Sequence, residues 1–404
     1  MPPSQPVRAL PAADLLRAIA VVGVVVVHAA HWPSTSTPAS ASLWNGLTLL
    51  SRFCVPVFVV LTGLLIEYRS SSDTGPRSFL TRRARRSLLP WLAWAPVYFL
   101  AGWMVTGDIT HTAYGAGDWW AGGGGHLYFL VLVPQLYLAY LVWPRGLTGQ
   151  LALAAAAICI QTGLDAARLS GSLGRPLSDL VVWHGYQLFP FWLGYLGIGI
   201  AAGGLLRRRG EPDRPHMAAA ALALAIPAAA LLLLVPAATG DMAPFADGTG
   251  AFLRPTLAPL VLAICAAVIL GGGRVMGASA PIRVAVGLLS ANALGIYIVQ
   301  VLVLQLPGRV LFPILEGGMA AQIAGFLLLV PATVALSTGA AVLLARSPLA
   351  WTVGVARRPG LLDSRRRPAT PVPSSPAAGV ERGRPHRVRR PVVPGLPPRQ
   401  EVPR

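Results

Sequence analysis

Arg17 and His28 lie in the first apolar segment of the chain, and their side chains could take part in chemistry there. They are eleven residues apart. In a helix this spacing puts both on one face, about 16 Å apart along the axis. Asp14 can pair with Arg17 across one turn. A neutral imidazole deep in such a segment can accept a proton from a hydroxyl group, so His28 is the candidate catalytic base. The alternative is a structural histidine that bonds a nearby carbonyl.

Arg52 is a third cation within an apolar segment, in the run Ser-Arg-Phe-Cys-Val-Pro that ends at Pro56. If this segment crosses a membrane from the opposite side, Arg52 lies at a depth similar to that of His28, and the two could share a cavity. We expect Arg52 to position the acceptor substrate or to stabilise a developing oxyanion. The alternative is an arginine that extends to the outer membrane surface.

Four arginines follow the second apolar segment within five residues, at positions 82, 83, 85 and 86. Such a cluster is typical of loop charge at the cytoplasmic face of a membrane. It also suits the phosphate groups of a cytoplasmic acyl donor, because the planar guanidinium binds phosphate through two parallel hydrogen bonds. Both interpretations stay open. The second assigns Arg83 and Arg86, together with Arg17, to donor binding.

The segments that must position these side chains are helices of a membrane protein. The 404 residues are 54% apolar and only 12% charged, which is about half the usual charged share of a globular protein. The apolar residues occur in long runs and lack the alternation of a transmembrane barrel. We therefore predict an all-α polytopic membrane protein with about ten transmembrane helices, at residues 14–32, 44–67, 87–106, 126–144, 150–166, 183–206, 217–237, 253–272, 284–306 and 319–345.

The distribution of arginine predicts the topology. All 33 basic residues are arginine, and the formal net charge is +18. Alternate loops between the predicted helices hold thirteen arginines and three arginines. The loops with thirteen should face the cytoplasm, and so should both termini. We expect a multi-pass protein of the cell membrane whose basic charge faces anionic lipid, with no nucleic acid as partner.

The predicted organisation has three parts. A short cytoplasmic N-terminus covers residues 1–13, a ten-helix domain covers residues 14–345, and a tail covers residues 346–404. The tail is rich in proline and arginine, so it should be disordered. An alternative for residues 1–42 is a cleaved signal peptide, which would remove the helix that carries His28.

Several familiar catalytic motifs are missing from the sequence. It contains neither Gly-x-Ser-x-Gly nor His-Glu-x-x-His, and its three cysteines lack the spacing of metal ligands. A serine hydrolase of the soluble type and a zinc protease therefore have no support. We expect neither a metal nor a bound cofactor.

The motifs, taken in order, resemble those of the acyltransferase-3 family of integral membrane acyltransferases. The similarity extends over about residues 10–345. It rests on Arg17-x10-His28, Ser51 to Phe58, Thr62-Gly63, Arg83-x-x-Arg86 with Pro90, His126 to Leu130, Phe191 to Gly194 and Ser290 to Tyr297.

The resemblance implies a ten-helix enzyme that transfers an acyl group, often acetyl, to a hydroxyl of a carbohydrate, an envelope glycan or a secondary metabolite. It implies acyl-CoA as a co-substrate that arrives from the cytoplasm. His28 matches the family's catalytic histidine and Arg17 its paired arginine, while Tyr297 and Arg52 are assigned to substrate binding. The chain departs from the family at Gln300, where a histidine is common, and glutamine cannot relay a proton.

Two other classes of function compete with this interpretation. A transporter or flippase for an envelope glycolipid would also need polar groups inside its helices. The predicted helices contain few acidic residues that could carry coupling protons, which counts against ion coupling. A non-catalytic membrane scaffold would give His28 a purely structural role.

Overall fold

The computed structural model describes residues 10–34, 38–69, 75–106, 125–239, 254 and 256–355. This part of the chain is helical and includes no strand. The helices that surround the site are α1 (Pro11–Ala29), α3 (Pro38–Ser51), α4 (Cys54–Tyr68), α5 (Pro76–Thr106), α6 (Tyr128–Leu141) and α13 (Ala280–Leu315). The others are α2 (His31–Ser34), α7 (Leu147–Leu169), α8 (Arg175–His184), α9 (Leu193–Arg209), α10 (Pro215–Thr239), α12 (Leu257–Ala278) and α14 (Met319–Arg346). Short 3-10 turns cover Gly125–Leu127, Gly185–Gln187, Phe189–Trp192 and Ala350–Val353.

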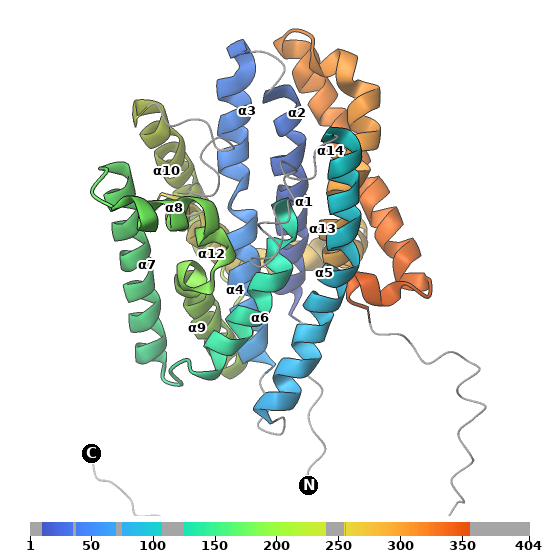
Figure 1. Cartoon of the computed structure of the whole chain (residues 1–404). Helices are drawn as coiled ribbons and strands as arrows, with labels where there is room; N and C mark the ends of the chain where they lie inside the picture. The colour runs from blue at the N-terminus through green and yellow to red at the C-terminus, as the bar shows by residue number, and fades with distance from the viewer. Residues whose placement is uncertain are drawn as a thin grey trace, which may run out of the picture. The chain divides into compact units, whose positions relative to one another are not determined.

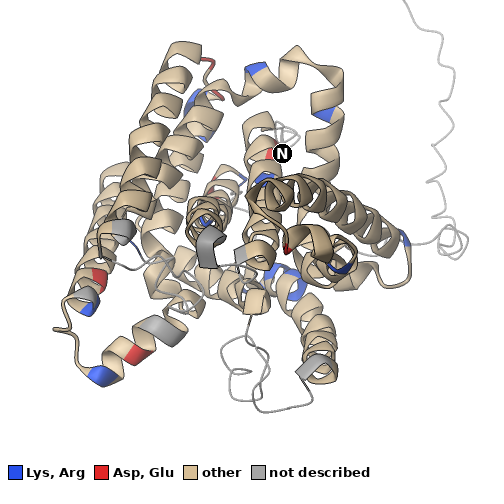
Figure 2. Cartoon of the chain, turned by 90° about the horizontal axis from the view of Figure 1, so that it is seen from above, with Lys and Arg blue, Asp and Glu red and all other residues tan. Residues whose placement is uncertain are grey.

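Eight of the described helices are long and apolar enough to cross a membrane, and they coincide with eight of the ten predicted segments. The remaining predictions, 87–106 and 126–144, fall on α5 and on the shorter apolar helix Gly125–Leu141. Most of the long helices run roughly parallel to one another (Figure 1). Seen end-on, charged residues are few on the ribbon (Figure 2). The protein is thus an all-α polytopic membrane protein with about ten spans.

Glycines bring α4 and α9 into close contact. A Cβ atom on Gly199 would lie 2.1 Å from the carbonyl oxygen of Val60, and one on Gly203 would lie 2.4 Å from that of Leu64. On the facing helix, a Cβ on Gly63 would lie 2.3 Å from the oxygen of Leu196. Small residues four apart allow helices to pack backbone against backbone. This close packing stabilises helix association in a membrane, where burial of apolar surface contributes little. This contact fixes α4, which carries one wall of the site.

The first helix, α1, lies in the interior and packs against α4, α12 and α13 (Figure 1). Val21 and Val25 cluster with Ile296 of α13. A Cβ on Gly23 would lie 3.0 Å from the side chain of Cys54. Residues 11–29 are thus an integral part of the helix bundle, which argues against their removal as a signal peptide.

Several helix boundaries differ from the predicted ones, and two of these differences affect the site. The predicted helix 44–67 is interrupted between α3 and α4, at Arg52 and Phe53. Pro56 explains the break, because a proline ring clashes with the carbonyl four residues earlier, at Arg52. The third predicted helix starts at Pro76 instead of residue 87. Proline is favoured at the first position of a helix, and arginine is a good helix former, so the arginines at 82–86 lie on α5 and not in a loop.

The folded structure extends beyond residue 345, where the sequence analysis places the end of the membrane domain. Ala350–Val353 forms a 3-10 turn whose Ala350, Thr352 and Val353 are buried. The indole of Trp94 in α5 donates a 3.1 Å hydrogen bond to the carbonyl of Thr352. The remainder of the predicted tail, from residue 356, lies outside the described residues.

An ion pair joins α4 and α9 at the end of the bundle where both helices finish. Arg207 forms a 2.6 Å ion pair with the Glu67 carboxylate and donates a 3.0 Å hydrogen bond to the Glu67 carbonyl. The hydroxyl of Tyr140 donates a 2.8 Å hydrogen bond to the same carboxylate. The Glu67 side chain therefore connects α4, α6 and α9. We call this end of the molecule the arginine end.

Candidate functional site

A cavity of about 830 Å³ lies among α1, α4, α5, α6 and α13. Along α4 its lining residues run from Phe58 to Arg69, which corresponds to about 16 Å of helix. One extremity lies at the arginine end, beside Arg69 and Arg145. The other lies deep in the bundle, beside Phe58, and is called the deep end. The cavity thus leads from the arginine end into the middle of the bundle.

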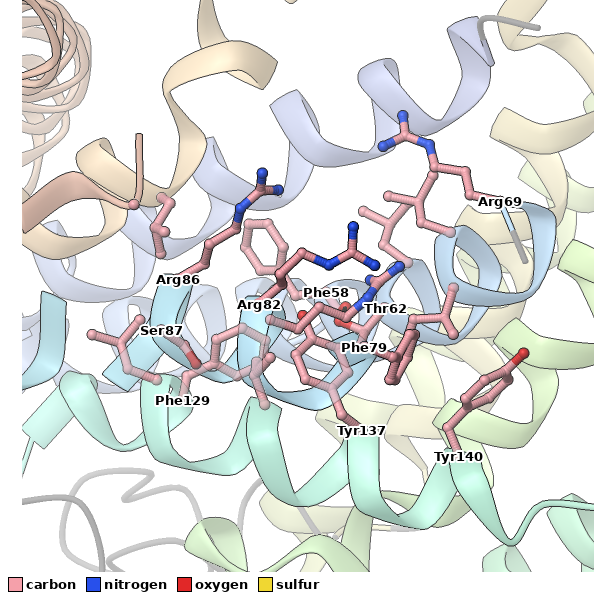
Figure 3. Close-up of a pocket in the computed structure, with 18 of the residues that line it drawn as sticks. Phe58, Thr62, Arg69, Phe79, Arg82, Arg86, Ser87, Phe129, Tyr137 and Tyr140 are labelled. Carbon is pink, nitrogen blue, oxygen red and sulfur yellow. Dashed lines mark hydrogen bonds between the residues drawn. The ribbon is translucent and has the colours of Figure 1, made fainter. Parts of the chain in front are cut away.

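Six arginines line this cavity, and among the residues that the structure describes no acidic side chain lines it. They belong to α1, to the end of α4, to the first part of α5 and to the turn after α6, and they are Arg17, Arg69, Arg82, Arg83, Arg86 and Arg145. In Figure 3 the guanidinium groups of Arg69, Arg82 and Arg86 gather on one side of a set of aromatic rings. Such an excess of guanidinium groups suits a ligand with several phosphate charges.

Arg17 is held in place by two polar partners. Its NH1 atom lies 3.1 Å from the Asp14 carboxylate, as the i, i+3 spacing predicts, and 2.7 Å from the Ser290 hydroxyl on α13. Ser290 in turn donates a 2.7 Å hydrogen bond to Asp14. These three residues connect α1 to α13 and orient one guanidinium at the wall of the cavity.

Aromatic rings form the wall opposite the guanidinium groups (Figure 3). The guanidinium carbon of Arg83 lies 4.6 Å from the ring centre of Phe79 and 5.5 Å from that of Tyr137. Phe79 is stacked on Tyr140, with ring centres 5.9 Å apart. Arg145 lies 5.9 Å from the centre of the Tyr140 ring. The rings restrict the positions of these two arginines through cation–π contact.

The carboxylate of Glu67 does not line the cavity, but it contacts Tyr140, which does. It is 7% exposed and bonds Tyr140 and Arg207, as described above. Its charge is therefore met by an arginine outside the cavity. Of the six arginines that line the cavity, Arg17 forms an ion pair with Asp14. The lining therefore keeps an excess of positive charge.

The deep end of the cavity is closed by three aromatic rings. Phe58 of α4, Phe129 of α6 and Tyr297 of α13 all line it. The ring centre of Phe129 lies 5.9 Å from that of Phe58 and 5.9 Å from that of Tyr297. We call these three residues the aromatic triad. They come from three different helices, so their arrangement depends on how the bundle packs.

A pair of histidines lies beyond the aromatic triad. The ring centre of His126 lies 5.4 Å from that of Tyr297 and 5.7 Å from that of His28. His126 is 6% exposed, and its Nε2 atom lies 3.3 Å from the carbonyl oxygen of Ile298. The hydroxyl of Tyr98, in edge contact with His126, donates a 2.6 Å hydrogen bond to the same carbonyl. His28 does not line the cavity. Its ring contacts His126, which in turn contacts the cavity residue Tyr297.

Arg52 is buried inside the protein, with 3% of its surface exposed, at the break between α3 and α4. It does not extend outward to a membrane surface, and it lies within electrostatic reach of His28. Neither residue lines the arginine-lined cavity. Their similar depth within a membrane stays a prediction from the sequence.

The predicted site residues fall into two groups. Arg17, Arg83, Arg86 and Tyr297 line the one cavity. His28 and Arg52 lie deeper, beyond the aromatic triad. From the arginine end inward, the order is thus the arginines, the aromatic triad and, beyond the cavity, the histidines.

The sequence analysis missed several residues of this site. It did not assign His126 a role, although an ionisable residue at the start of an apolar helix is a signal for function. It counted Arg69 and Arg145 only as loop charge and named Arg82 only as part of the cluster at 82–86, yet all three line the cavity. No spacing rule links His126 to His28 or places Arg145 and Arg69 at one cavity, because both arrangements arise only when distant helices pack.

Comparison with known proteins bears on the chemistry of this cavity. Neither the curated proteins nor the solved structures include a match to the chain. The model of the acyltransferase-3 domain, described as an acyltransferase domain, matches residues 10–346, which hold both histidines and all six arginines. This match covers most of the chain, and the chain therefore belongs to the acyltransferase-3 family of membrane acyltransferases.

Proposed function

We propose that the protein transfers an acyl group, in the first instance acetyl, from acyl-CoA to a hydroxyl of a carbohydrate, an envelope glycan or a secondary-metabolite acceptor. The observation that carries the proposal is the cavity lined by six arginines, with no acidic residue among its described lining residues. CoA bears several phosphate charges, which are costly to bring into an apolar bundle unless cations receive them. In this proposal Arg17, Arg83 and Arg86 hold the donor, joined by Arg69, Arg82 and Arg145.

The proposal places the donor along the cavity with its phosphates at the arginine end. The pantetheine arm then extends toward the aromatic triad, and the thioester comes close to His126 and His28. The cavity offers about 16 Å of length along α4 for that arm. The arginine end faces the cytoplasm in this arrangement, since CoA is cytoplasmic and arginine-rich loops stay on that side.

His28 supplies the base in the proposed chemistry. It takes the proton of the acceptor hydroxyl while the oxygen attacks the thioester carbonyl, the carbon–sulfur bond breaks and the proton passes to the CoA sulfur. In a second route the imidazole itself first accepts the acyl group and then gives it to the acceptor. Arg52, within electrostatic reach of His28, stabilises the oxyanion in either route or positions the acceptor together with Tyr297.

The proposal is tested with the purified full-length protein, radiolabelled acetyl-CoA and an extract of envelope glycans and small hydroxylated metabolites. Wild type should move the label to a hydroxylated acceptor as a base-labile ester. His28→Ala should lose at least about 100-fold in rate, the lower range for the loss of a general base. It should still elute as a folded monodisperse protein.

Two results would contradict the proposal in different ways. Near wild-type transfer by His28→Ala would remove the catalytic role of this residue and leave the transferase activity standing. Absence of label transfer in wild type, combined with ATP-independent movement of a glycolipid across vesicles, would favour the flippase alternative instead.

A further inference from the structure

The aromatic triad separates the arginine-lined cavity from the histidine pair. Phe58, Phe129 and Tyr297 line the deep end, whereas His28 and His126 do not line the cavity at all. Tyr297 touches both sides, because its ring contacts Phe129 and His126. Any group that enters from the arginine end must therefore pass these rings before it reaches His28.

The space around the triad is closed from several directions. Phe58 packs against the α1 and α13 cluster that contains Val21, Val25 and Ile296. Tyr297 is 5% exposed. Phe129 is partly buried and packs against the main hydrophobic core. A closely packed interior cannot expand easily, so each methylene group added there has an energetic cost.

We propose that the aromatic triad sets the length of the acyl group that the enzyme accepts and restricts it to short chains such as acetyl and propionyl. This inference rests on the proposed use of acyl-CoA. The phosphates bind the six arginines regardless of the acyl group, and only the acyl end meets the triad. Donor recognition is thereby divided between two ends of one cavity.

The division makes different predictions for two phenylalanines that line the same cavity. Phe79 lies near the arginine end, beside Arg83, and Phe129 belongs to the triad. Phe79→Ala should weaken the binding of every CoA derivative by a similar factor. Phe129→Ala should instead relax the limit on chain length and leave the short-chain derivative almost unaffected.

The experiment measures the binding of hydrolysis-resistant acetyl-CoA and octanoyl-CoA analogues, in which a methylene group stands beside the carbonyl in place of sulfur. Isothermal titration of the purified full-length protein gives the Kd of each. Wild type should bind the octanoyl analogue at least about tenfold more weakly than the acetyl analogue, a typical penalty for excess methylenes in a fitted pocket. Phe129→Ala should bring the two Kd values within about threefold of each other by removing that penalty.

Controls keep the outcomes distinct. Phe189→Ala changes an exposed phenylalanine outside the cavity and should keep the wild-type ratio. If Phe129→Ala does not elute as a folded protein, Phe129→Leu and Phe58→Leu supply the smaller side chains. Equal Kd values for both analogues in wild type, or an unchanged ratio in the folded triad variants, would overturn the role of the triad. If wild type binds neither analogue nor free CoA, the proposed donor itself is wrong.

Discussion

At the scale of single residues, the cavity combines many cations with few counter-charges. Arg17 is paired with Asp14, and both bond Ser290. Glu67 is engaged by Arg207, which does not line the cavity. Arg17 and Arg83 are partly buried and the other four cavity arginines are exposed, so solvent screens part of their mutual repulsion, and an entering anion relieves the rest. The site is therefore organised to gain stability when an anionic ligand binds.

The contribution of one cavity arginine to donor binding can be measured at Arg86, which is exposed on α5 and lines the cavity. Arg86→Ala should raise the apparent KM for acetyl-CoA with little change in kcat. The loss of one charge-assisted hydrogen bond costs about 1.5–3 kcal/mol, which corresponds to a roughly ten- to hundredfold weaker donor interaction.

Arg85 is the matched control for this substitution. It precedes Arg86 on the same helix and is also exposed, but it does not line the cavity. Arg85→Ala should leave the steady-state parameters for acetyl-CoA close to those of wild type. Equal effects of both substitutions would show that general surface charge, and not the cavity, attracts the donor.

At the scale of helices, the contact between α4 and α9 holds the wall of the cavity in place. Gly199→Ala would put a Cβ atom 2.1 Å from the Val60 carbonyl oxygen and 2.9 Å from its carbon. Backbone cannot yield as a flexible side chain does, so the helices must separate. We expect a loss of about 1–3 kcal/mol in the free energy of unfolding, seen as a lower melting temperature in detergent.

Gly339→Ala on α14 is the comparison for this prediction. A Cβ atom there would meet nothing within 4 Å. Because alanine is the better helix former, this variant should be as stable as wild type or slightly more stable. If Gly199→Ala melted at the same temperature as Gly339→Ala, close packing of α4 on α9 would not contribute to stability.

The positions of the helices could be predicted, because each long apolar run in the sequence marks a segment that can span a membrane. Each of the ten predicted segments overlaps one or two described helices, and the pairing of Arg17 with Asp14 follows from a spacing of three. The break before α4 also has a local cause, in Pro56. What hydropathy could not predict is which helices face each other. The contact between His28 and His126 joins residues 98 positions apart, and it arises only from tertiary packing.

At the scale of the whole molecule, the proposed function requires the arginine end to face the compartment that holds acyl-CoA. Five of the six cavity arginines come from the end of α4, the first part of α5 and the turn after α6, and Arg17 comes from α1. Alternate loops hold thirteen and three arginines, and the richer set includes this end. Arginine-rich loops stay cytoplasmic, so charge distribution and the needs of a CoA donor predict the same orientation.

Reporter fusions test that orientation. A reporter fused after residue 355 leaves the buried turn Ala350–Val353 intact and should report the cytoplasm. A reporter inserted within residues 107–124, between the third and fourth predicted spans, should report the opposite side. A third reporter at Gly146, next to the cavity residue Arg145, should report the cytoplasm again.

If the reporters at 355 and at 107–124 lay on the same side, the number of spans between them would be even. The Ala-rich α7, of which little is buried, would then be the first helix to remove from the set of spans. If the Gly146 reporter lay outside, the arginine end would face away from cytoplasmic CoA, and the proposed direction of donor entry would be wrong.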